Sequence, residues 1–474
     1  MKRIDTFKYL IPREGDMKVD AMIFSSERLI MEKEAVRQLQ NAASIPGVSK
    51  ALATPDIHVG YGVPIGCVLA MENEVIPSAV GYDINCGMRL MTTPFSDGEI
   101  DIKKVADSIR RDVPLGEGRK NIKLNKSDLK NVLKNGVKSM TDWAKQYPRL
   151  EEAWNDDEFE NDLEKIEENG SMQGDSSSVS FRAMDRGKDQ IGTLGGGNHF
   201  IEIQKVKSIA DERTASSLGL KKDQIVIMIH SGSRALGHQV GGDYMKPAAA
   251  ESRGKSPDRS LGFFAADSEN GRRYIGAMRA AANFAFVNRE VMALLVRRNF
   301  KHYFGDIALP LIYDIAHNMV KKEVHNGKSL WVHRKGATRA FPKSLMRNTC
   351  YQHLGQPVII PGSMGTASYL LLGTESGRES LYSVNHGAGR TMSRSQARGK
   401  VRRKTGKVIK PAAISDKRFE ESMKGIYLLC ENRRSIKEEA PDAYKDIDEV
   451  IRVVTGAGLA TLAAKMIPLA VLKG

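Results

Sequence analysis

The feature that most limits the possible folds of this chain is a set of short apolar runs, each next to a cluster of glycine or serine. Residues 225–234 read IVIMIHSGSR, and similar runs are HFIEI (199–203), PVIIPGS (357–363) and SYLLLG (368–373). Runs of this length, bounded by glycine or proline, are typical of buried strands. Helical patterns lie between them, notably over residues 276–298. The chain is therefore predicted to be an α+β protein with polar loops at its strand ends.

Residues 100–190 differ in composition from the rest of the chain. They hold two charged amphipathic segments (102–112 and 129–145), then the acidic stretch EEAWNDDEFENDLEKIEEN and the polar run GSMQGDSSSVS. We expect a helical, partly mobile subregion there, with the mobile loop near residues 170–180. Another helix is expected over residues 26–43. No repeat with a period of about 20–50 residues is present, which excludes solenoids.

The formal net charge of +15 makes an anionic partner plausible, and nucleic acid, a nucleotide or anionic lipid would each satisfy it. The charge is densest between Arg390 and Arg418, where eleven Lys or Arg residues face one acid, Asp416. This stretch fits a solvated charged surface as well as a nucleic-acid interface. Its position directly after a glycine-rich histidine motif favours the interface.

The cysteines and the apolar segments point to a cytoplasmic protein that does not enter a membrane. The four cysteines form no CxxC pair, which argues against a zinc ribbon, and so few thiols fit a reducing compartment. The first residues, MKRIDTFKYLIPREG, lack the apolar segment of a signal peptide. Residues 456–472 are apolar, but they include Lys465 and Pro468 and are short for a membrane span.

Five residues in separate loops are candidate metal ligands. Asp83 and Cys86 lie three residues apart in VGYDINCGMRL. His199 ends a glycine run, His230 ends an apolar strand, and His317 lies in YDIAHNMV. Histidines in such loops are well placed as ligands, whereas Cys86 alone also fits a small buried apolar residue. Imidazole and thiolate suit zinc, cobalt or iron, a carboxylate helps to accommodate manganese, and five ligands suit two ions. Two-metal sites typically act on phosphoryl groups.

Other histidines compete for the same role. His58, His238 and His333 also lie in motifs rich in glycine or basic residues, and each is an alternative ligand. Three more histidines occur in polar, charged contexts and are expected at the surface: His302, His325 and His353.

Several glycine-rich loops are suited to phosphate. The chain has no P-loop, because its two GKS tripeptides lack the upstream glycine of that motif. Instead GGGN (195–198), SGSR (231–234), PGSMGTAS (361–368) and HGAGR (386–390) offer unobstructed backbone N–H groups. In HGAGR an imidazole beside two glycines can attack an activated phosphorus and form a transferable phosphoramidate. A glycine-rich turn with a solvent-exposed histidine is the alternative.

Taken together and in order, these motifs resemble the RtcB family of RNA-splicing ligases. The resemblance spans more than 400 residues and rests on PDIHVGYGVPIG, GYDINCGMRL, GGGNHFIEI, HSGSRALG, AHNMV, HRKGATRAFP, IPGSMGTASYLL, HGAGRTMSRSQA and LKG. It implies a single compact ligase domain over residues 1–474, with β-sheets surrounded by helices. It also implies an enzyme of RNA repair or tRNA splicing that joins an RNA 3′-phosphate or 2′,3′-cyclic phosphate to a 5′-hydroxyl, with GTP as co-substrate and two Mn²⁺ ions.

The resemblance assigns the metal ligands. Asp83, Cys86 and His199 would hold one Mn²⁺. Cys86, His230 and His317 would hold the second, so that Cys86 bridges the two ions.

The resemblance also assigns the nucleophile and the substrate contacts. His386 would take GMP from GTP and pass it to the RNA 3′-phosphate, and the 5′-hydroxyl would then displace GMP. A cyclic phosphate would first be opened by hydrolysis. The implied nucleotide contacts are Asn198, Glu202, Asn318, Ser363, Ser368, His386, Gly387, Ala388, Gly389, Tyr444 and Lys473. The implied RNA-phosphate contacts are Arg234, Arg390 and Arg394. Asp56 is a carboxylate near the site without an assigned role.

Two other functions remain open at this point. A two-metal phosphodiesterase or phosphatase acting on RNA ends would need no GTP and would leave Glu202 and Lys473 unexplained. A non-enzymatic RNA-binding protein would need only the net charge. An activating protein of the archease type is a possible partner of the ligase. The acidic insert around residues 150–180 matches no motif of the family.

Overall fold

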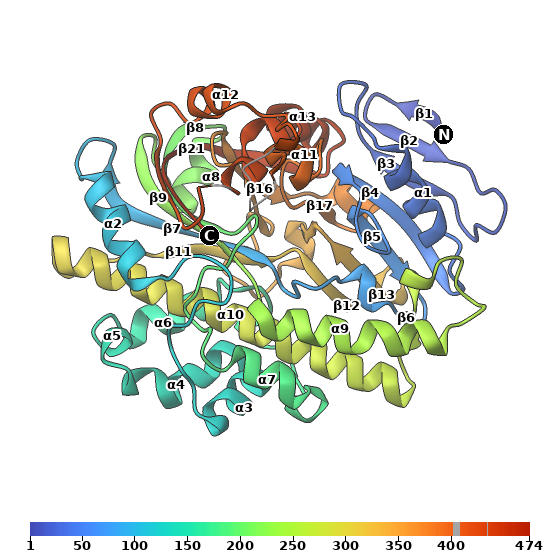
Figure 1. Ribbon diagram of the computed structural model, residues 1–474, viewed down its shortest axis with the longest axis horizontal. Coiled ribbons are helices and arrows are strands. Elements are labelled where there is room, and N and C mark those ends of the chain that lie inside the picture. Colours follow the sequence, from blue (N-terminus) through green and yellow to red (C-terminus); the bar gives the residue numbers. More distant parts are fainter. Residues whose placement is uncertain (402–407, 434) are drawn as a thin grey trace.

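Two large β-sheets with helices packed around them form the protein (Figure 1). The computed structural model describes residues 1–401, 408–433 and 435–474. This arrangement confirms the predicted α+β class. The basic stretch that follows the histidine motif is described only in part, because residues 402–407 lie outside the described residues.

The first sheet has seven strands in the order β1-β2-β3-β4-β5-β13-β12. These strands are β1 (Lys2–Asp5), β2 (Lys8–Ile11), β3 (Ala21–Phe24), β4 (Val48–His58), β5 (Ile65–Met71), β12 (Asn318–His325) and β13 (Lys328–Lys335). Only β3 and β4 pair in parallel. The register between β4 and β5 shifts between Ala53 and His58, so the end of β4 leaves the regular ladder.

The second sheet has the order β11-β7-β9-β8-β21-β16-β15, and β20 also pairs with β21. Its strands are β7 (Gly87–Ser96), β8 (Phe200–Ile209), β9 (Gln224–Ser231), β11 (Leu311–Ala316), β15 (Pro357–Ile360), β16 (Ser368–Gly373), β20 (Tyr427–Cys430) and β21 (Ala460–Lys473). The four predicted strands are confirmed as parts of β8, β9, β15 and β16. The apolar residues 456–472 lie largely in β21, in the middle of this sheet.

Three strand pairs lie outside the large sheets. They are β6 (Glu74–Val75) with β10 (Phe264–Ala265), β14 (Ala337–Arg339) with β17 (Ser383–Asn385), and β18 (Lys400–Val401) with β19 (Val408–Lys410). The pair β14–β17 matters most for function, because β17 leads directly into the HGAGR loop.

Helix α10 (Glu269–Phe304) is the longest helix and runs beneath the sheets beside α9 (Arg234–Glu251) in Figure 1. The other helices are α1 (Lys33–Ala42), α2 (Ile102–Asp112), α3 (Lys126–Asn135), α4 (Met140–Trp143), α5 (Pro148–Glu151), α6 (Asp156–Leu163), α7 (Phe181–Gly187), α8 (Glu212–Ser217), α11 (Arg394–Arg398), α12 (Asp416–Ser422) and α13 (Ile447–Gly456). Among the described residues, no helix is long and apolar enough to cross a membrane.

Two of the predicted helices differ from the structure. The amphipathic segment 129–145, expected to be helical, is split between α3 and α4. The break lies at Gly136, which has a φ of 60°, and a Cβ there would approach the carbonyl oxygen of Gly170 to 2.2 Å. The expected helix over 26–43 begins only at Lys33. The prediction over 102–112 matches α2.

A buried ionic cluster ties α10 to the second sheet. Arg289 of α10 and Arg89 of β7 both pair with Asp314 of β11, and all three side chains are fully buried. Arg289 also donates hydrogen bonds to the carbonyl oxygens of Asn85 at 2.8 Å and Ser231 at 2.9 Å. Asn85 precedes Cys86, and Ser231 follows His230, so one guanidinium holds the backbone beside two predicted metal ligands.

We predict that Arg289→Met lowers the free energy of unfolding by about 3–5 kcal/mol, because it leaves Asp314 buried with one partner fewer. Arg298→Met is the matched control on the same helix. The Arg298 side chain is 30% exposed and pairs with Asp112 at 2.9 Å, so its replacement is expected to cost about 1 kcal/mol or less. Urea unfolding of both variants measures the difference. Equal losses would show that the buried cluster has no special role in stability.

Candidate active site

The five predicted metal ligands lie at one edge of the second sheet. Asp83 and Cys86 precede β7, and His199 precedes β8. His230 lies at the end of β9, and His317 follows β11. These four strands are consecutive neighbours in the order β11-β7-β9-β8, and all their pairings are antiparallel. The starts of β7 and β8 and the ends of β9 and β11 therefore meet at the same edge.

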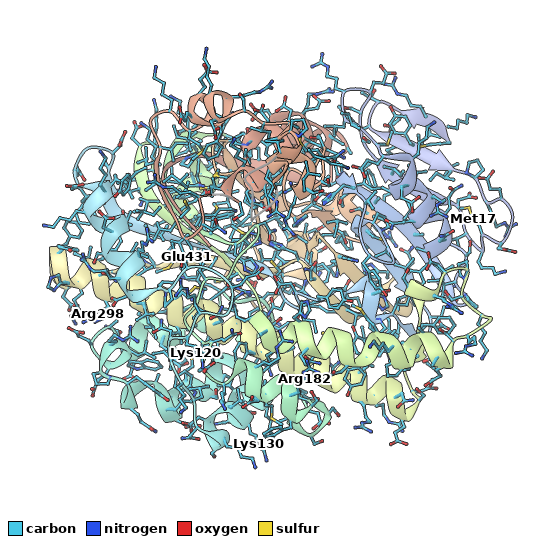
Figure 2. The ribbon with its side chains drawn as sticks, viewed as in Figure 1. Met17, Lys120, Lys130, Arg182, Arg298 and Glu431 are labelled. Atoms are coloured by element: carbon cyan, nitrogen blue, oxygen red, sulfur yellow. The ribbon has the colours of Figure 1, made fainter. Side chains whose placement is uncertain are left out.

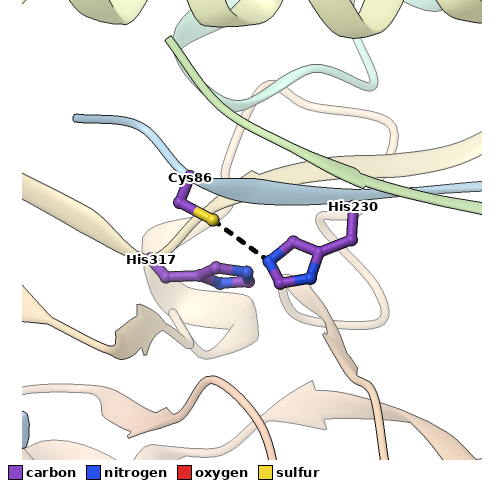
Figure 3. Close-up of side chains that lie close together, drawn as sticks. All are labelled: Cys86, His230 and His317. Carbon is purple, nitrogen blue, oxygen red and sulfur yellow. Dashed lines mark hydrogen bonds between the residues drawn. The ribbon is translucent and has the colours of Figure 1, made fainter. Parts of the chain in front are cut away.

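The side chains converge on two sets of ligand atoms. Cys86, His230 and His317 form one set, and Asp83, Cys86 and His199 form the other, with ligand atoms within 4.8 Å of one another in each. The Cys86 Sγ atom lies 3.1 Å from Nε2 of His230 and 3.4 Å from Nε2 of His199. His199 Nε2 lies 2.8 Å from Oδ2 of Asp83. Figure 3 shows Cys86, His230 and His317 approaching one another from three separate segments.

The orientation of the imidazoles fits metal ligands. His230 Nδ1 lies 3.2 Å from the carbonyl oxygen of Asn198, and His317 Nδ1 lies 3.2 Å from Oγ1 of Thr338. These contacts hold the δ nitrogens, as outer partners commonly do for ligating histidines. His317 Nε2 is buried and has no hydrogen-bond partner in the described part of the chain. A thiol, a carboxylate and inward-facing ε nitrogens are a donor set that fits divalent metal ions.

Burial sets the protonation of these groups. It lowers the pKa of His230 and of His317 well below the usual value, and neighbouring imidazoles lower both further. Both rings are therefore neutral near pH 7, as metal ligands must be. Burial, with the charge of Asp83, raises the pKa of the Cys86 thiol well above its usual value. A bound cation opposes this shift and favours the thiolate.

His386 forms a hydrogen-bonded pair with Asp56. His386 follows β17, Asp56 lies near the end of β4, and His386 Nδ1 is 2.7 Å from Oδ2 of Asp56. The other carboxylate oxygen, Oδ1, accepts a hydrogen bond from Thr54 Oγ1 at 2.6 Å. Burial alone would raise the pKa of Asp56, but the hydrogen bond and charge of His386 outweigh it, and the pKa is lowered. Asp56 is therefore an ionised acceptor beside the candidate nucleophile.

Lys445 connects the two segments that carry this pair. Its Nζ donates to the carbonyl oxygens of Pro55 at 3.1 Å and Ile57 at 2.7 Å, on either side of Asp56. Its backbone N–H donates to the carbonyl oxygen of Gly389 at 2.8 Å. Gly389 has a φ of 77°, and a Cβ there would lie 2.3 Å from the carbonyl oxygen of Asp56. The sequence analysis missed Lys445, whose only signal was its position next to Tyr444.

A cavity of about 650 Å³ joins His386 to the metal-ligand cluster. Cys86, His230 and Asp83 line one side of it. The predicted nucleotide and RNA contacts that also line it are Asn198, Asn318, Ser363, His386, Gly387, Ala388, Gly389, Arg390, Arg394, Tyr444 and Lys473. Most of the predicted pocket therefore surrounds one cavity.

Glu202 and Ser368 do not line that cavity but lie buried behind its wall. Gln204 connects them, because its Nε2 donates to the Glu202 carboxylate and, at 3.0 Å, to Ser368 Oγ. Burial raises the pKa of Glu202 to about 7. Lys473 lies on β21, which pairs with the β8 strand of Glu202, and its Nζ is 5.6 Å from the centre of the Phe200 ring. Burial lowers the pKa of Lys473.

The predicted arginines occupy two positions. Arg390 packs over the Tyr444 ring at 4.9 Å, and Arg394 Nε donates to Glu439 at 3.1 Å, so both lie at the rim of the first cavity. Glu439, which the sequence analysis did not select, also accepts from the Tyr444 hydroxyl. Arg234 lies in a second cavity, and its φ of 55° is uncommon for a residue other than glycine. Such strain is often retained at functional sites.

The competing histidines lie outside both ligand sets. His58 lines the first cavity, with its Nδ1 2.8 Å from the carbonyl oxygen of Asp56. His333 is buried and accepts the Ile76 backbone N–H at 2.9 Å. His238 is exposed and stacks on Tyr82.

The three histidines expected at the surface gave a mixed outcome. His302 and His353 are exposed, which confirms the prediction for both. For His325 the prediction is wrong. It ends β12 and is buried, with its Nε2 2.9 Å from the carboxylate of Glu323, a contact that neighbouring charges along the sequence did not reveal.

The fold and the site together define a class of protein. Members of this class are α+β proteins whose strand-end loops carry the ligands of a candidate two-metal site. A histidine hydrogen-bonded to a carboxylate lines the same glycine-rich cavity. The profile of the tRNA-splicing ligase RtcB family matches residues 38–474. The chain belongs to this family, and it is an RNA ligase of the tRNA-splicing type.

Curated relatives of the same family match this chain along its whole length. It is 41% identical to the tRNA-splicing ligase RtcB of Thermococcus kodakarensis over 499 residues, which cover 100% of this chain and 99% of that protein. It is also 41% identical to the tRNA-splicing ligase RtcB of Aeropyrum pernix, with the same coverage of both chains. The RNA-splicing ligase RtcB homolog 1 of Entamoeba histolytica is 40% identical, over 97% of this chain and 90% of that protein.

We predict that added Co²⁺ gives a thiolate-to-cobalt absorption band that depends on Cys86, because Cys86 contributes to both ligand sets. Cys86→Ala is expected to abolish the band and to weaken binding of the ion by about 10-fold or more. Cys67→Ala removes another buried thiol, away from the ligand sets, and should leave the band unchanged. A band that survives in Cys86→Ala would contradict a cysteine ligand.

Proposed function

We propose that the chain joins RNA 3′-phosphate or 2′,3′-cyclic phosphate ends to 5′-hydroxyl ends, with GTP as co-substrate and two Mn²⁺ ions. The observation that carries this proposal is the His386–Asp56 pair at the cavity shared with the metal ligands. Family membership supports the reaction class. The reaction serves tRNA splicing or RNA repair. The four cysteines are all free thiols, which supports a reducing, cytoplasmic location.

His386 acts as the nucleophile of the first step. The ionised Asp56 carboxylate accepts a hydrogen bond from Nδ1–H, and this fixes the tautomer that has its lone pair on Nε2. Nε2 attacks the α-phosphorus of GTP, the new N–P bond forms, and the bond to the β-phosphate oxygen breaks to release pyrophosphate. Asp56 stabilises the positive charge that develops on the ring.

The guanylate is then transferred to the RNA. An oxygen of the RNA 3′-phosphate attacks the phosphorus of the phosphoramidate, the N–P bond breaks, and His386 regains its lone pair. The RNA 5′-hydroxyl attacks the activated 3′-phosphorus, loses its proton and displaces GMP, which leaves a 3′,5′-phosphodiester. A 2′,3′-cyclic phosphate is first opened by hydrolysis to the 3′-phosphate.

The five converging ligands would hold the two ions, with Cys86 common to both. Bound there, Mn²⁺ supplies Lewis-acid stabilisation of charge on phosphoryl oxygens. Asn318 supports this region from the chain itself. Its side-chain amide donates to the Asp83 carbonyl oxygen at 3.0 Å, and its side-chain oxygen accepts the Gly336 N–H at 2.8 Å. These two contacts orient the metal-ligand loop against the nucleotide side of the cavity.

The nucleotide contacts are proposed from their position around the cavity. Ser363, Gly387 and Gly389 present hydroxyl and backbone groups to phosphate. Tyr444 and Lys473 also line the cavity and would contact the guanine nucleotide. The carboxylate of Glu202, buried on the neighbouring strand, suits the guanine N1 and N2 donors once the base is bound, and adenine would present the wrong edge.

We further propose that residues 1–474 act as one ligase domain. Asp56 comes from the first sheet, and the metal ligands come from the second. Arg390 and Arg394 line the first cavity and would contact RNA phosphates. No single sheet carries the whole site.

We predict that Asp56→Asn slows covalent labelling of the protein by [α-³²P]GTP by about 10²–10⁴-fold, because the amide N–H₂ can donate to Nδ1 and favour the wrong tautomer, and because a neutral amide does not stabilise the charged ring. Asp156→Asn, a change at an exposed carboxylate, is the control and should label at the rate of the wild-type protein. A normal rate in Asp56→Asn would remove Asp56 from the mechanism.

A ligation assay tests the whole reaction. An RNA pair with a 2′,3′-cyclic phosphate and a 5′-hydroxyl is incubated with GTP or ATP and with Mn²⁺, Co²⁺ or Zn²⁺. We expect a joined product with GTP and Mn²⁺, and at least about 10²-fold less with ATP. Joining without any nucleotide, or opening of the cyclic phosphate without joining, would contradict the guanylate step.

A further inference from the structure

A second cavity, of about 740 Å³, meets the first one at the metal-ligand loop. Asp83, Asn198 and Arg394 line both cavities, so the two adjoin at the proposed metal site. Basic and acidic residues both line the second cavity: Lys120, Arg186, Lys188, Arg234 and Arg394, with Asp83, Glu117, Asp185 and Asp189. Lys120 pairs with Asp189 at 2.6 Å, and Lys188 pairs with Asp185 at 2.5 Å, so the arginines are the cations left for a ligand. Lys120 is labelled in Figure 2, on the segment that follows α2. Arg234 and Arg394 are the cationic groups through which an RNA phosphate would bind in this cavity.

Two aromatic rings lie along the same cavity. Tyr82 and His238 both line it, and their rings are stacked, with centroids 4.7 Å apart and an interplanar angle of 20°. Tyr61 extends the row, with its ring centroid 6.0 Å from that of Tyr82. Tyr82 is 37% exposed and Tyr61 is 51% exposed, so solvent reaches both tyrosines. His238 is exposed as well.

This row of rings lies next to the proposed metal site and to Arg234. Tyr82 directly precedes the ligand Asp83, and His238 lies four residues after Arg234 on α9, which places both on one side of that helix. Arg234 Nε donates to Thr193 Oγ1 at 3.2 Å, and this holds the arginine beside the glycine loop. Aromatic rings and basic groups therefore line one channel that leads to the metal site.

Packing within the chain does not explain these rings. Across the described residues, the His238 side chain makes no hydrogen bond, and its one ring contact is with Tyr82. The Tyr82 hydroxyl likewise has no hydrogen-bond partner within the described ranges. Exposed rings beside arginine side chains suit single-stranded nucleic acid, because a base stacks on the ring while its phosphate contacts the cationic groups.

We propose that Tyr82 and His238 form a stacking platform for an unpaired base next to the RNA end that enters through the second cavity. This inference rests on the proposed function and adds a positioning role to it. The stacked base aligns the terminal nucleotide with the site, and Arg234 and Arg394 bind the phosphates on either side of it. Both the 5′-hydroxyl strand and the 3′-phosphate strand carry such a base.

Loss of a platform ring and loss of an arginine should change the salt dependence of RNA binding in different ways. Stacking involves no ion pair, so loss of a ring weakens binding without changing the slope of log K against log salt. Loss of one phosphate contact lowers that slope by about one. Tyr82→Leu is therefore expected to weaken RNA binding by about 5- to 100-fold at an unchanged slope, whereas Arg234→Gln changes the slope.

The test measures binding of short RNAs that carry 2-aminopurine at the base next to the end. One RNA has it at the 5′-hydroxyl end and the other at the 3′-phosphate end, and each is titrated with the full chain at several salt concentrations, without GTP. We expect quenching of one of the two probes, which identifies the strand, and loss of that quenching in Tyr82→Leu and in His238→Ala. Tyr82→Phe, which retains the ring, should quench as the wild-type protein does.

Tyr303→Leu is the matched control. It removes a tyrosine that also lies beside a histidine, His302, with ring centroids 5.0 Å apart, but on α10 and outside both cavities. Its quenching and affinity should equal those of the wild-type protein. Thermal unfolding verifies that each variant is folded, and His238→Ala, an exposed helix position, gives a second variant if Tyr82→Leu is unstable.

The outcomes separate this inference from the proposed function. If the wild-type protein ligates RNA with GTP but neither probe is quenched, or if Tyr82→Leu and His238→Ala bind and quench normally, the platform is wrong and the ligase mechanism stands. If quenching depends on Tyr82 but GTP supports no ligation, the platform stands and the guanylate mechanism is wrong.

Discussion

The site depends on one buried ion pair, between Arg289 of α10 and Asp314 of β11. Arg289 donates hydrogen bonds to the backbone beside Cys86 and beside His230. Its partner Asp314 lies three residues before His317. A pair with no exposed surface is a poor source of net stability, because desolvation offsets most of its Coulomb attraction. Its value here is geometric. It fixes three ligand-bearing segments relative to one rigid helix, so their side chains are held close together before an ion binds.

The proposed nucleophile, His386, is held by a different part of the fold. Asp56 leaves the regular ladder near the end of β4, and Lys445 and Gly389 bring the HGAGR loop against it. The two arrangements meet in a T-shaped contact between the imidazole rings of His317 and His386, whose centroids lie 5.4 Å apart. The first cavity therefore receives its metal ligands from one sheet and its histidine from the region of the other. The second cavity adjoins the same metal-ligand loop, because Asp83 and Asn198 line both cavities.

Much of this could be predicted from the sequence, and the exceptions have physical causes. Strands and ligand loops were predictable because apolar runs and glycine clusters are local signals. The break at Gly136 depends on a contact with Gly170, and the burial of His325 depends on Glu323, so neither followed from its sequence neighbours alone. The role of Asp56 also escaped, because it pairs with a residue 330 positions away. The sequence predicted which residues belong to the site better than how they are connected.

The most direct test is to locate the covalent guanylate. The protein is incubated with GTP and Mn²⁺, digested at alkaline pH, where a phosphoramidate survives, and analysed by mass spectrometry. The mechanism predicts one GMP adduct, on the peptide that carries His386, and its loss in His386→Ala, a variant that removes the nucleophile but none of the five metal ligands. A GMP adduct on any other residue, or RNA joining by His386→Ala at the normal rate, would contradict it.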